Sequence, residues 1–165
     1  MIIIFLIVMI KKILVAIDGS KLAGRSLDYA IDLAQRYSAK ITVLTVINLP
    51  SNLLIDKDEV FTPASTQEFL KKIENYHKKI LKKAIEKIKK QSQKIIVSQM
   101  LLTGRPADKI IKTAKEENID LIVIGSRGLG GIKEFFLGSV SDRVADAAPC
   151  PVLIIKDNKN QTKNI

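Results

Sequence analysis

Residues 121–139 read LIVIGSRGLGGIKEFFLGS. An apolar run opens this stretch, a glycine-dense loop follows, and Gly138-Ser139 stand before the helical pattern of Val140 to Ala147. The order predicts a strand, a flexible loop and the start of a helix. Glycines let backbone N–H groups approach a ligand, and a helix N-terminus adds unpaired donors and partial positive charge. The stretch therefore predicts a site for an anion such as the phosphate of a nucleotide.

Strand and helix patterns alternate along the whole chain. Runs that are apolar along nearly their full length, such as Leu121 to Ile124, are typical of parallel strands covered by helices on both faces. We therefore expect an α/β fold with a five-stranded parallel, doubly wound sheet in three α/β/α layers. The expected strands are Lys12 to Ile17, Ile41 to Ile47, Ile95 to Leu102, Leu121 to Ile124 and Val152 to Ile155.

Four segments between these strands have helical spacing. Ser20 to Tyr37 opens with a serine that can cap a helix, and Pro106 to Asn118 opens with a proline tolerated in a first turn. Lys71 to Lys94 holds ten lysines and two glutamates, with apolar residues every three or four positions. This pattern predicts an amphipathic helix whose lysines face solvent. The alternative is a basic surface for a partner or a nucleic acid, although no aromatic interleaving or zinc-ligand spacing accompanies it.

The composition is that of an ordinary globular protein. The chain has 165 residues, 47% of them hydrophobic and 27% charged, with a net charge of +10. No run reaches the ~18 apolar residues that a membrane-spanning helix requires. A single cysteine, Cys150, cannot form an internal disulfide, which favours the cytoplasm. We interpret Cys150 and the only histidine, His77 on the basic helix, as structural residues.

The sequence predicts one domain, residues 9–156. Residues 1–8 form an apolar extension too short to span a bilayer, and Met9 begins a complete first strand. Either translation starts at Met9, or the extension is a short extra strand or flap. We expect a long, mobile connection from Leu49 to Thr66 and a flexible tail over residues 157–165.

A carboxylate follows the first expected strand. Asp18 is succeeded by Gly19-Ser20, and ligands of doubly wound sheets bind at the carboxyl ends of the strands. If the first and fourth strands are neighbours, Asp18 and Gly125 flank one crevice. The carboxylate then either accepts hydrogen bonds from a ribose or an adenine amino group, or helps to cap the helix that follows.

The glycine loop does not match the commonest phosphate-binding motifs. It lacks the Gly-Lys-Ser/Thr ending of a P-loop, and Lys133 stands where a dinucleotide fingerprint has its third glycine. The spacing Gly-x2-Gly-x9-Gly-Ser, formed by Gly125, Gly128, Gly138 and Ser139, resembles the ATP-binding signature of the universal stress protein family. The resemblance extends over residues 9–156, including Ile13-Leu-Val-Ala-Ile-Asp-Gly-Ser20 at the first strand and Ala148-Pro-Cys-Pro-Val-Leu-Ile-Ile155 at the last.

The resemblance implies a strand order of 3-2-1-4-5 and a role for each matching residue. Asp18 and the backbone of Val46 would hold the adenosine end of ATP, with Ala16 lining the pocket. Gly125 and Gly128 would approach the ribose and the phosphates. The residues implied for the phosphates are Gly138, Ser139 and Val140 through backbone donors, with the Ser139 hydroxyl.

Three positions near the phosphates keep an alternative. Ser139 and Asp142, three residues apart, also resemble a capping box, which would commit the Ser139 hydroxyl to the helix. Arg127 and Lys133 either neutralise phosphate charge or belong to the solvated surface.

The resemblance also implies a function. We expect a cytoplasmic, ATP-binding regulatory protein of the stress response, without efficient turnover of ATP. Mg²⁺ would be bound through the phosphates, and a homodimer would form through the last strand, Val152 to Ile155, because this apolar edge would otherwise be exposed. The alternatives are a slow ATPase or a phosphoryl or nucleotidyl transferase of related fold, and a basic module that binds a partner or a nucleic acid.

Overall fold

A five-stranded parallel sheet forms the centre of the structure, a computed structural model that describes residues 10–49, 63–129 and 137–157. All neighbouring strands pair in parallel, in the order β3-β2-β1-β4-β5. This arrangement confirms the predicted fold class and strand order. The strands are β1 (Lys12–Ala16), β2 (Lys40–Ile47), β3 (Val97–Thr103), β4 (Leu121–Gly125) and β5 (Val152–Ile155).

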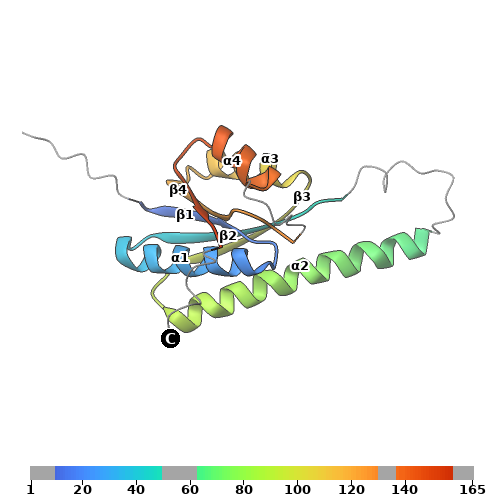
Figure 1. The fold of residues 1–165 in the computed structure, drawn as a ribbon. Helices are drawn as coiled ribbons and strands as arrows, with labels where there is room; N and C mark the ends of the chain where they lie inside the picture. Colours follow the sequence, from blue (N-terminus) through green and yellow to red (C-terminus); the bar gives the residue numbers. More distant parts are fainter. Residues whose placement is uncertain (1–9, 50–62, 130–136, 158–165) are drawn as a thin grey trace, which may run out of the picture.

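Helices cover both faces of this sheet (Figure 1). Helices α1 (Lys21–Tyr37) and α2 (Pro63–Gln91) lie on one face, and α3 (Pro106–Glu116) and α4 (Ser139–Ala147) lie on the other. Because successive side chains of a strand point to opposite faces, neighbouring residues of β1 enter different cores. Ile13 packs with α1 and α2 and Leu14 with α3 and α4, both fully buried.

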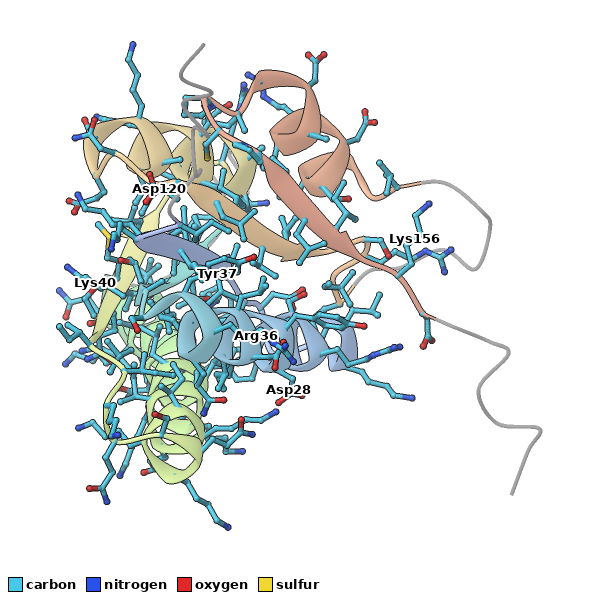
Figure 2. The ribbon with its side chains drawn as sticks, turned by 90° about the vertical axis from the view of Figure 1, so that its left-hand side faces the viewer. Asp28, Arg36, Tyr37, Lys40, Asp120 and Lys156 are labelled. Carbon is cyan, nitrogen blue, oxygen red and sulfur yellow. The ribbon has the colours of Figure 1, made fainter. Side chains whose placement is uncertain are left out.

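One carboxylate joins the amino ends of β1 and β4. Asp120 Oδ2 accepts the backbone N–H groups of Lys11 at 2.8 Å and Lys12 at 2.9 Å. The Lys12 ammonium donates to the carbonyl of Glu117 at 2.8 Å. Figure 2 faces this end of the molecule and labels Asp120 together with Lys40 at the start of β2. Asp120, which precedes β4, thereby fixes the start of β1 against its neighbour.

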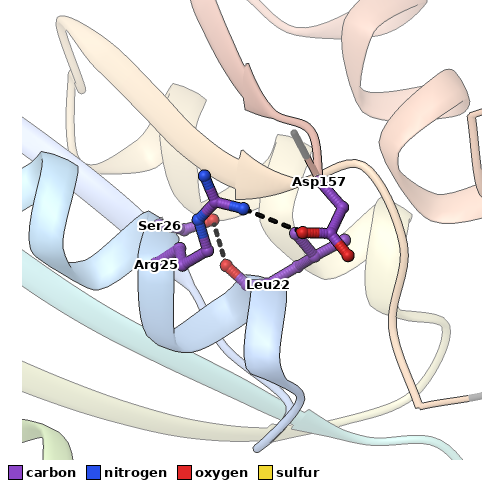
Figure 3. Close-up of polar contacts among 4 residues, drawn as sticks. All are labelled: Leu22, Arg25, Ser26 and Asp157. Carbon is purple, nitrogen blue, oxygen red and sulfur yellow. Dashed lines mark hydrogen bonds and ion pairs between the residues drawn. The ribbon is translucent and has the colours of Figure 1, made fainter. Parts of the chain in front are cut away.

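The first helix begins as its sequence predicts. The Ser20 hydroxyl caps α1 by accepting the Ala23 N–H at 3.1 Å. Within the helix, the Ser26 hydroxyl donates to the Leu22 carbonyl at 2.9 Å (Figure 3). Arg25 forms an ion pair with Asp157 at 3.0 Å, which connects α1 to the segment after β5.

The basic helix is amphipathic, as predicted. Its inner face buries Leu81, Ala84 and Ile88, whereas the lysines of its outer face form ion pairs such as Lys72–Glu68 at 2.8 Å. Such exposed pairs are typical of a solvated helix surface and contribute little to stability. Among the described residues, no helix is long and apolar enough to cross a membrane.

Several predicted boundaries were wrong. Helix α2 begins at Pro63, so the end of the expected Leu49 to Thr66 connection is helical; proline suits a first helical turn because its missing N–H has no acceptor there. Helix α3 ends at Glu116, because Asn118 adopts a positive φ of 50°. Strand β3 begins at Val97, opposite Ile41, rather than at Ile95. The predictions for residues 1–8, for most of the connection and for the tail after Asp157 lie outside the described residues.

Candidate functional site

A cavity of about 800 Å³ opens at the carboxyl ends of the strands. Cavities that bind small molecules commonly measure about 300–1,000 Å³. The structure brings all nine predicted binding residues into the lining of this one cavity, although their binding roles stay predictions. They are Ala16, Asp18, Val46, Gly125, Arg127, Gly128, Gly138, Ser139 and Val140.

Strand pairing positions the two sides of the crevice. Strand β1 pairs directly with β4, with Ala16 opposite Ile124, so Asp18 and Gly125 follow neighbouring strand positions. This confirms the predicted crevice. On the other side of β1, Ala16 lies opposite Leu44, and β2 continues to Ile47. The end of β2 therefore extends beyond β1 and stands at the cavity.

Asp18 connects the first strand to the glycine loop. Its Oδ1 accepts the Ser20 N–H at 2.9 Å, and its Oδ2 accepts the Leu129 N–H at 2.9 Å. The helix cap itself is the Ser20 hydroxyl, so Asp18 supports the turn without capping α1. Asp18 also lines the cavity, so its carboxylate can accept a hydrogen bond from a ligand as well as from the Leu129 N–H.

The loop approaches Asp18 so closely that a side chain at one position would force the carboxylate to move. A Cβ atom added to Gly128 would collide with Asp18 Oδ2. Any larger residue at this position would push the carboxylate away from the Leu129 N–H. The second glycine of the signature is therefore explained by its contact with Asp18.

The start of α4 differs from the predicted capping box. Gly138 is the N-cap and makes no side-chain cap bond, so Ser139 is already the first helical residue. Instead of Ser139, the buried Ser141 hydroxyl lies 3.0 Å from the Ser126 carbonyl and 2.9 Å from that of Gly138. The capping-box hypothesis was wrong because Gly138, with φ of −68° and ψ of 153°, takes the cap conformation one residue earlier.

One of the predicted backbone donors at this helix start already has a partner. The Gly138 N–H donates to the Ser126 carbonyl at 2.8 Å, and its role as a phosphate donor stays a prediction. Ser139 and Val140 lie in the first turn, where N–H groups have no acceptor within the helix. Both line the cavity, so they are the donors that an anion would meet there.

His77 enters the cavity lining from α2, a contribution that the sequence analysis missed. Its Nδ1 lies 2.9 Å from the Thr45 hydroxyl, and Thr45 is 1% exposed. Burial lowers the pKa of His77, and the Asp18 carboxylate opposes this shift. The bond to Thr45 agrees with a structural role, but the cavity position was not predicted. No local signal identifies it, since it depends on how α2 packs against β2.

Other lining residues follow from rules that the sequence offers. Asn48 comes directly after β2 and Asp18 two residues after β1, so the same strand-end argument would have found Asn48. Leu44, Ile110 and Ile124 supply apolar walls.

Cys150 lies outside this cavity lining, partly buried against the core beneath α3 and α4, and burial raises the pKa of its thiol. This agrees with its interpretation as a packed residue. Lys133 lies outside the described residues.

Similarity to known proteins extends over most of the chain. The universal stress protein family pattern matches residues 9–156. Universal stress protein YxiE of Bacillus subtilis is 37% identical, with 90% of this chain and 100% of YxiE covered. The solved universal stress protein UspA from Lactobacillus plantarum has a TM-score of 0.74 at 27% identity, covering 88% of this chain and 97% of UspA. A universal stress protein solved in complex with cAMP has a TM-score of 0.62 at 26% identity, covering 88% of this chain and 95% of that protein. The chain therefore belongs to the universal stress protein family.

Proposed function

We propose that this protein binds ATP in the cavity at the carboxyl ends of its strands and acts as a cytoplasmic regulatory protein of the stress response. The observation that carries the proposal is the convergence of Asp18, the glycine loop and the start of α4 around one cavity of about 800 Å³. The relative solved in complex with cAMP supports an adenine nucleotide as the class of ligand.

The adenosine end would lie between β1 and β2. Here the Asp18 carboxylate supplies an acceptor for ribose hydroxyls or the adenine amino group, and Val46 lies in the part of β2 that extends past β1. Ala16 of β1 lies opposite Ile124, the residue before Gly125 in β4. Ala16 and Gly125 present little side-chain bulk to the ligand. These small walls leave room for a planar base and its ribose.

The phosphates would lie against the start of α4. The N–H groups of Ser139 and Val140 and the exposed Ser139 hydroxyl would donate to phosphate oxygens, and the helix dipole would favour their negative charge. Arg127, also in the lining, would add a positive charge. Mg²⁺ would be held by the phosphates, since the described residues contain no group of three or more potential metal-ligating side chains.

We propose a homodimer formed through β5. Strand β5 (Val152–Ile155) is the last in the sheet order, so among the described residues no strand pairs with its outer side, which could pair with a second copy. Sedimentation equilibrium would test this, with a dimer mass expected at micromolar concentration and a monomer mass contradicting it.

The first experiment identifies the ligand directly. Freshly purified protein is denatured, and released small molecules are separated by chromatography. We expect ATP from the wild type and none from Gly138→Val, because a valine side chain would enter the cavity wall beside Ser126. No released nucleotide, together with no binding of added ATP in calorimetry, would reject the proposal.

The same preparation separates binding from catalysis. We expect bound ATP to remain intact during incubation. Steady release of ADP that disappears in Gly138→Val would instead establish the slow ATPase. Steeply salt-dependent affinity for DNA or RNA would establish the basic binding module, because phosphate contacts release counterions.

A further inference from the structure

His77 reaches the cavity from the side of the sheet opposite to α4. Helix α2 covers the face that also carries α1, whereas α4 covers the other face (Figure 1). The phosphate donors of the proposed site, Ser139 and Val140, belong to α4. His77 therefore lies on the far side of the cavity from the proposed phosphate position and near the end of β2, where the adenosine is proposed to bind.

The ring of His77 is held by a buried partner. Its Nδ1 lies 2.9 Å from the Thr45 hydroxyl, and Thr45 is 1% exposed. The carboxylate of Asp18, which raises the pKa of His77 against the effect of burial, is the acidic group acting on the ring. With Nδ1 bonded to Thr45, the ring nitrogen left for a ligand is Nε2.

One of the two neutral tautomers of His77 leaves Nε2 as a hydrogen-bond donor. Burial lowers the pKa of His77, so the ring is neutral at neutral pH and carries one proton. With the proton on Nε2, Nδ1 accepts the Thr45 O–H. Nε2–H is then a donor on a ring that is held through Nδ1.

We infer that His77 is a nucleoside-recognition residue, whose Nε2–H donates to an acceptor atom of the bound nucleoside, either a ribose oxygen or a purine ring nitrogen. This inference rests on the proposed binding of ATP and adds a contact from α2 to it. Asp18 supplies an acceptor and His77 a donor at the same end of the cavity, a pair that recognises both kinds of polar group on a nucleoside. Binding at this end would also connect α2 to the ligand.

Three variants separate recognition from packing. The amide nitrogen of His77→Gln can occupy the place of Nε2, whereas the amide of His77→Asn is too short and can replace only Nδ1. His77→Phe keeps the ring and removes both nitrogens. We expect affinity for ATP and for adenosine to fall about fivefold to tenfold in His77→Asn and His77→Phe, and less than about threefold in His77→Gln. Equal affinities in all folded variants would overturn the inference.

A second measurement observes the ring itself. Because His77 is the only histidine, its Hε1 resonance is unambiguous in protein without a histidine tag. We expect saturating adenosine or ATP to shift this resonance and inorganic triphosphate to leave it unchanged. A shift with triphosphate alone would place the ring at the phosphates and overturn the inference. If ATP binds in calorimetry but leaves the resonance unmoved, His77 recognition fails and the proposed function stands. If ATP does not bind at all, both fail.

Discussion

The two ends of the sheet use similar residues for different purposes. At the carboxyl end, the Asp18 carboxylate accepts two backbone N–H groups and also lines the large cavity. At the amino end, the Asp120 carboxylate likewise accepts two backbone N–H groups, those of Lys11 and Lys12. A carboxylate with satisfied hydrogen bonds is therefore no guide to function by itself. What distinguishes the two aspartates is that Asp18, unlike Asp120, lines the large cavity.

The amino end has a cavity too, but of different character. It measures about 340 Å³ and is lined by residues in the last turns of α1 and after α1 and α2, including Ser38, Lys40 and Lys94. The C-termini of helices carry partial negative charge and present carbonyl acceptors, which attract lysines and repel phosphate. The carboxyl end receives the N-termini of the helices instead. The direction of the chain in a parallel α/β sheet thus assigns anion binding to one end only.

The largest effect should come from closing the carboxyl-end cavity. Gly128→Val would displace the Asp18 carboxylate from the loop, because even a Cβ atom at this position collides with Oδ2. Losing the interactions of this charged group, together with the bulk of valine in the cavity lining, should weaken ATP binding about a hundredfold in calorimetry. The matched change at the other end, Lys94→Ala, should leave affinity unchanged. Equal losses in both variants would contradict the assignment of the site to one end.

Removing each aspartate should separate binding from stability. Asp18→Ala should weaken ATP binding about tenfold or more, since a charged hydrogen-bond partner is lost. Asp120→Ala should leave affinity unchanged but lower the free energy of unfolding by about 1–3 kcal/mol, because two N–H groups lose a charged acceptor. Calorimetry and urea unfolding measure the two quantities. A binding defect in Asp120→Ala, at full folding, would show that the ends are coupled.

One turn at each end of the sheet has a positive φ, and glycine should stabilise the protein at both positions. Gly19, after β1, has a φ of 88°, and a Cβ atom there would lie 3.0 Å from Ile80 Cδ1. Ser38, after α1, adopts a φ of 52° without being glycine. We expect Gly19→Ala to destabilise the protein by about 1–2 kcal/mol and Ser38→Gly to stabilise it by about 0.5 kcal/mol. Unfolding in urea tests both, and a stabilising Gly19→Ala would contradict the strain argument.

Features that depend on a local pattern of consecutive residues were predictable from the sequence. The apolar runs predicted the five strands, and the strand-end position of Asp18 together with the spacing of Gly125 and Gly128 predicted which residues meet at the cavity. Each of these depends on where a strand ends, which local hydrophobicity marks clearly. Parallel pairing then brings the strand ends together without any further information.

Features that depend on helix rotation or on a single backbone angle were not predictable. His77 enters the cavity because α2 packs at one rotation against β2, and its lysine-rich neighbours predict only a solvated helix. The start of α4 shifted by one residue because Gly138 rather than Ser139 adopts the cap conformation. Serine is the better cap by propensity, but the Ser126 carbonyl fixes Gly138 through a 2.8 Å bond. Tertiary contacts therefore override the local preference.

The smallest predicted effect distinguishes the two ends by pH. His77, the only histidine, lies at the carboxyl end, and burial lowers its pKa below the ordinary value of 6.5. The unfolded chain therefore binds a proton more readily than the folded chain. This contribution to stability is complete above pH 6.5 and is lost as the pH falls through the lower pKa of the folded state.

Replacing the histidine should remove this part of the pH dependence. Between about pH 7.5 and about pH 5, the free energy of unfolding of the wild type should fall more than that of His77→Gln. The difference should be small because Asp18 opposes the shift, and it should grow in Asp18→Asn, where the opposing charge is absent and the pKa of His77 falls further. Urea unfolding at both pH values measures it. An unchanged difference in Asp18→Asn would mean that the carboxylate does not act on the ring, and the donor and acceptor assigned to the carboxyl end would then be independent of each other.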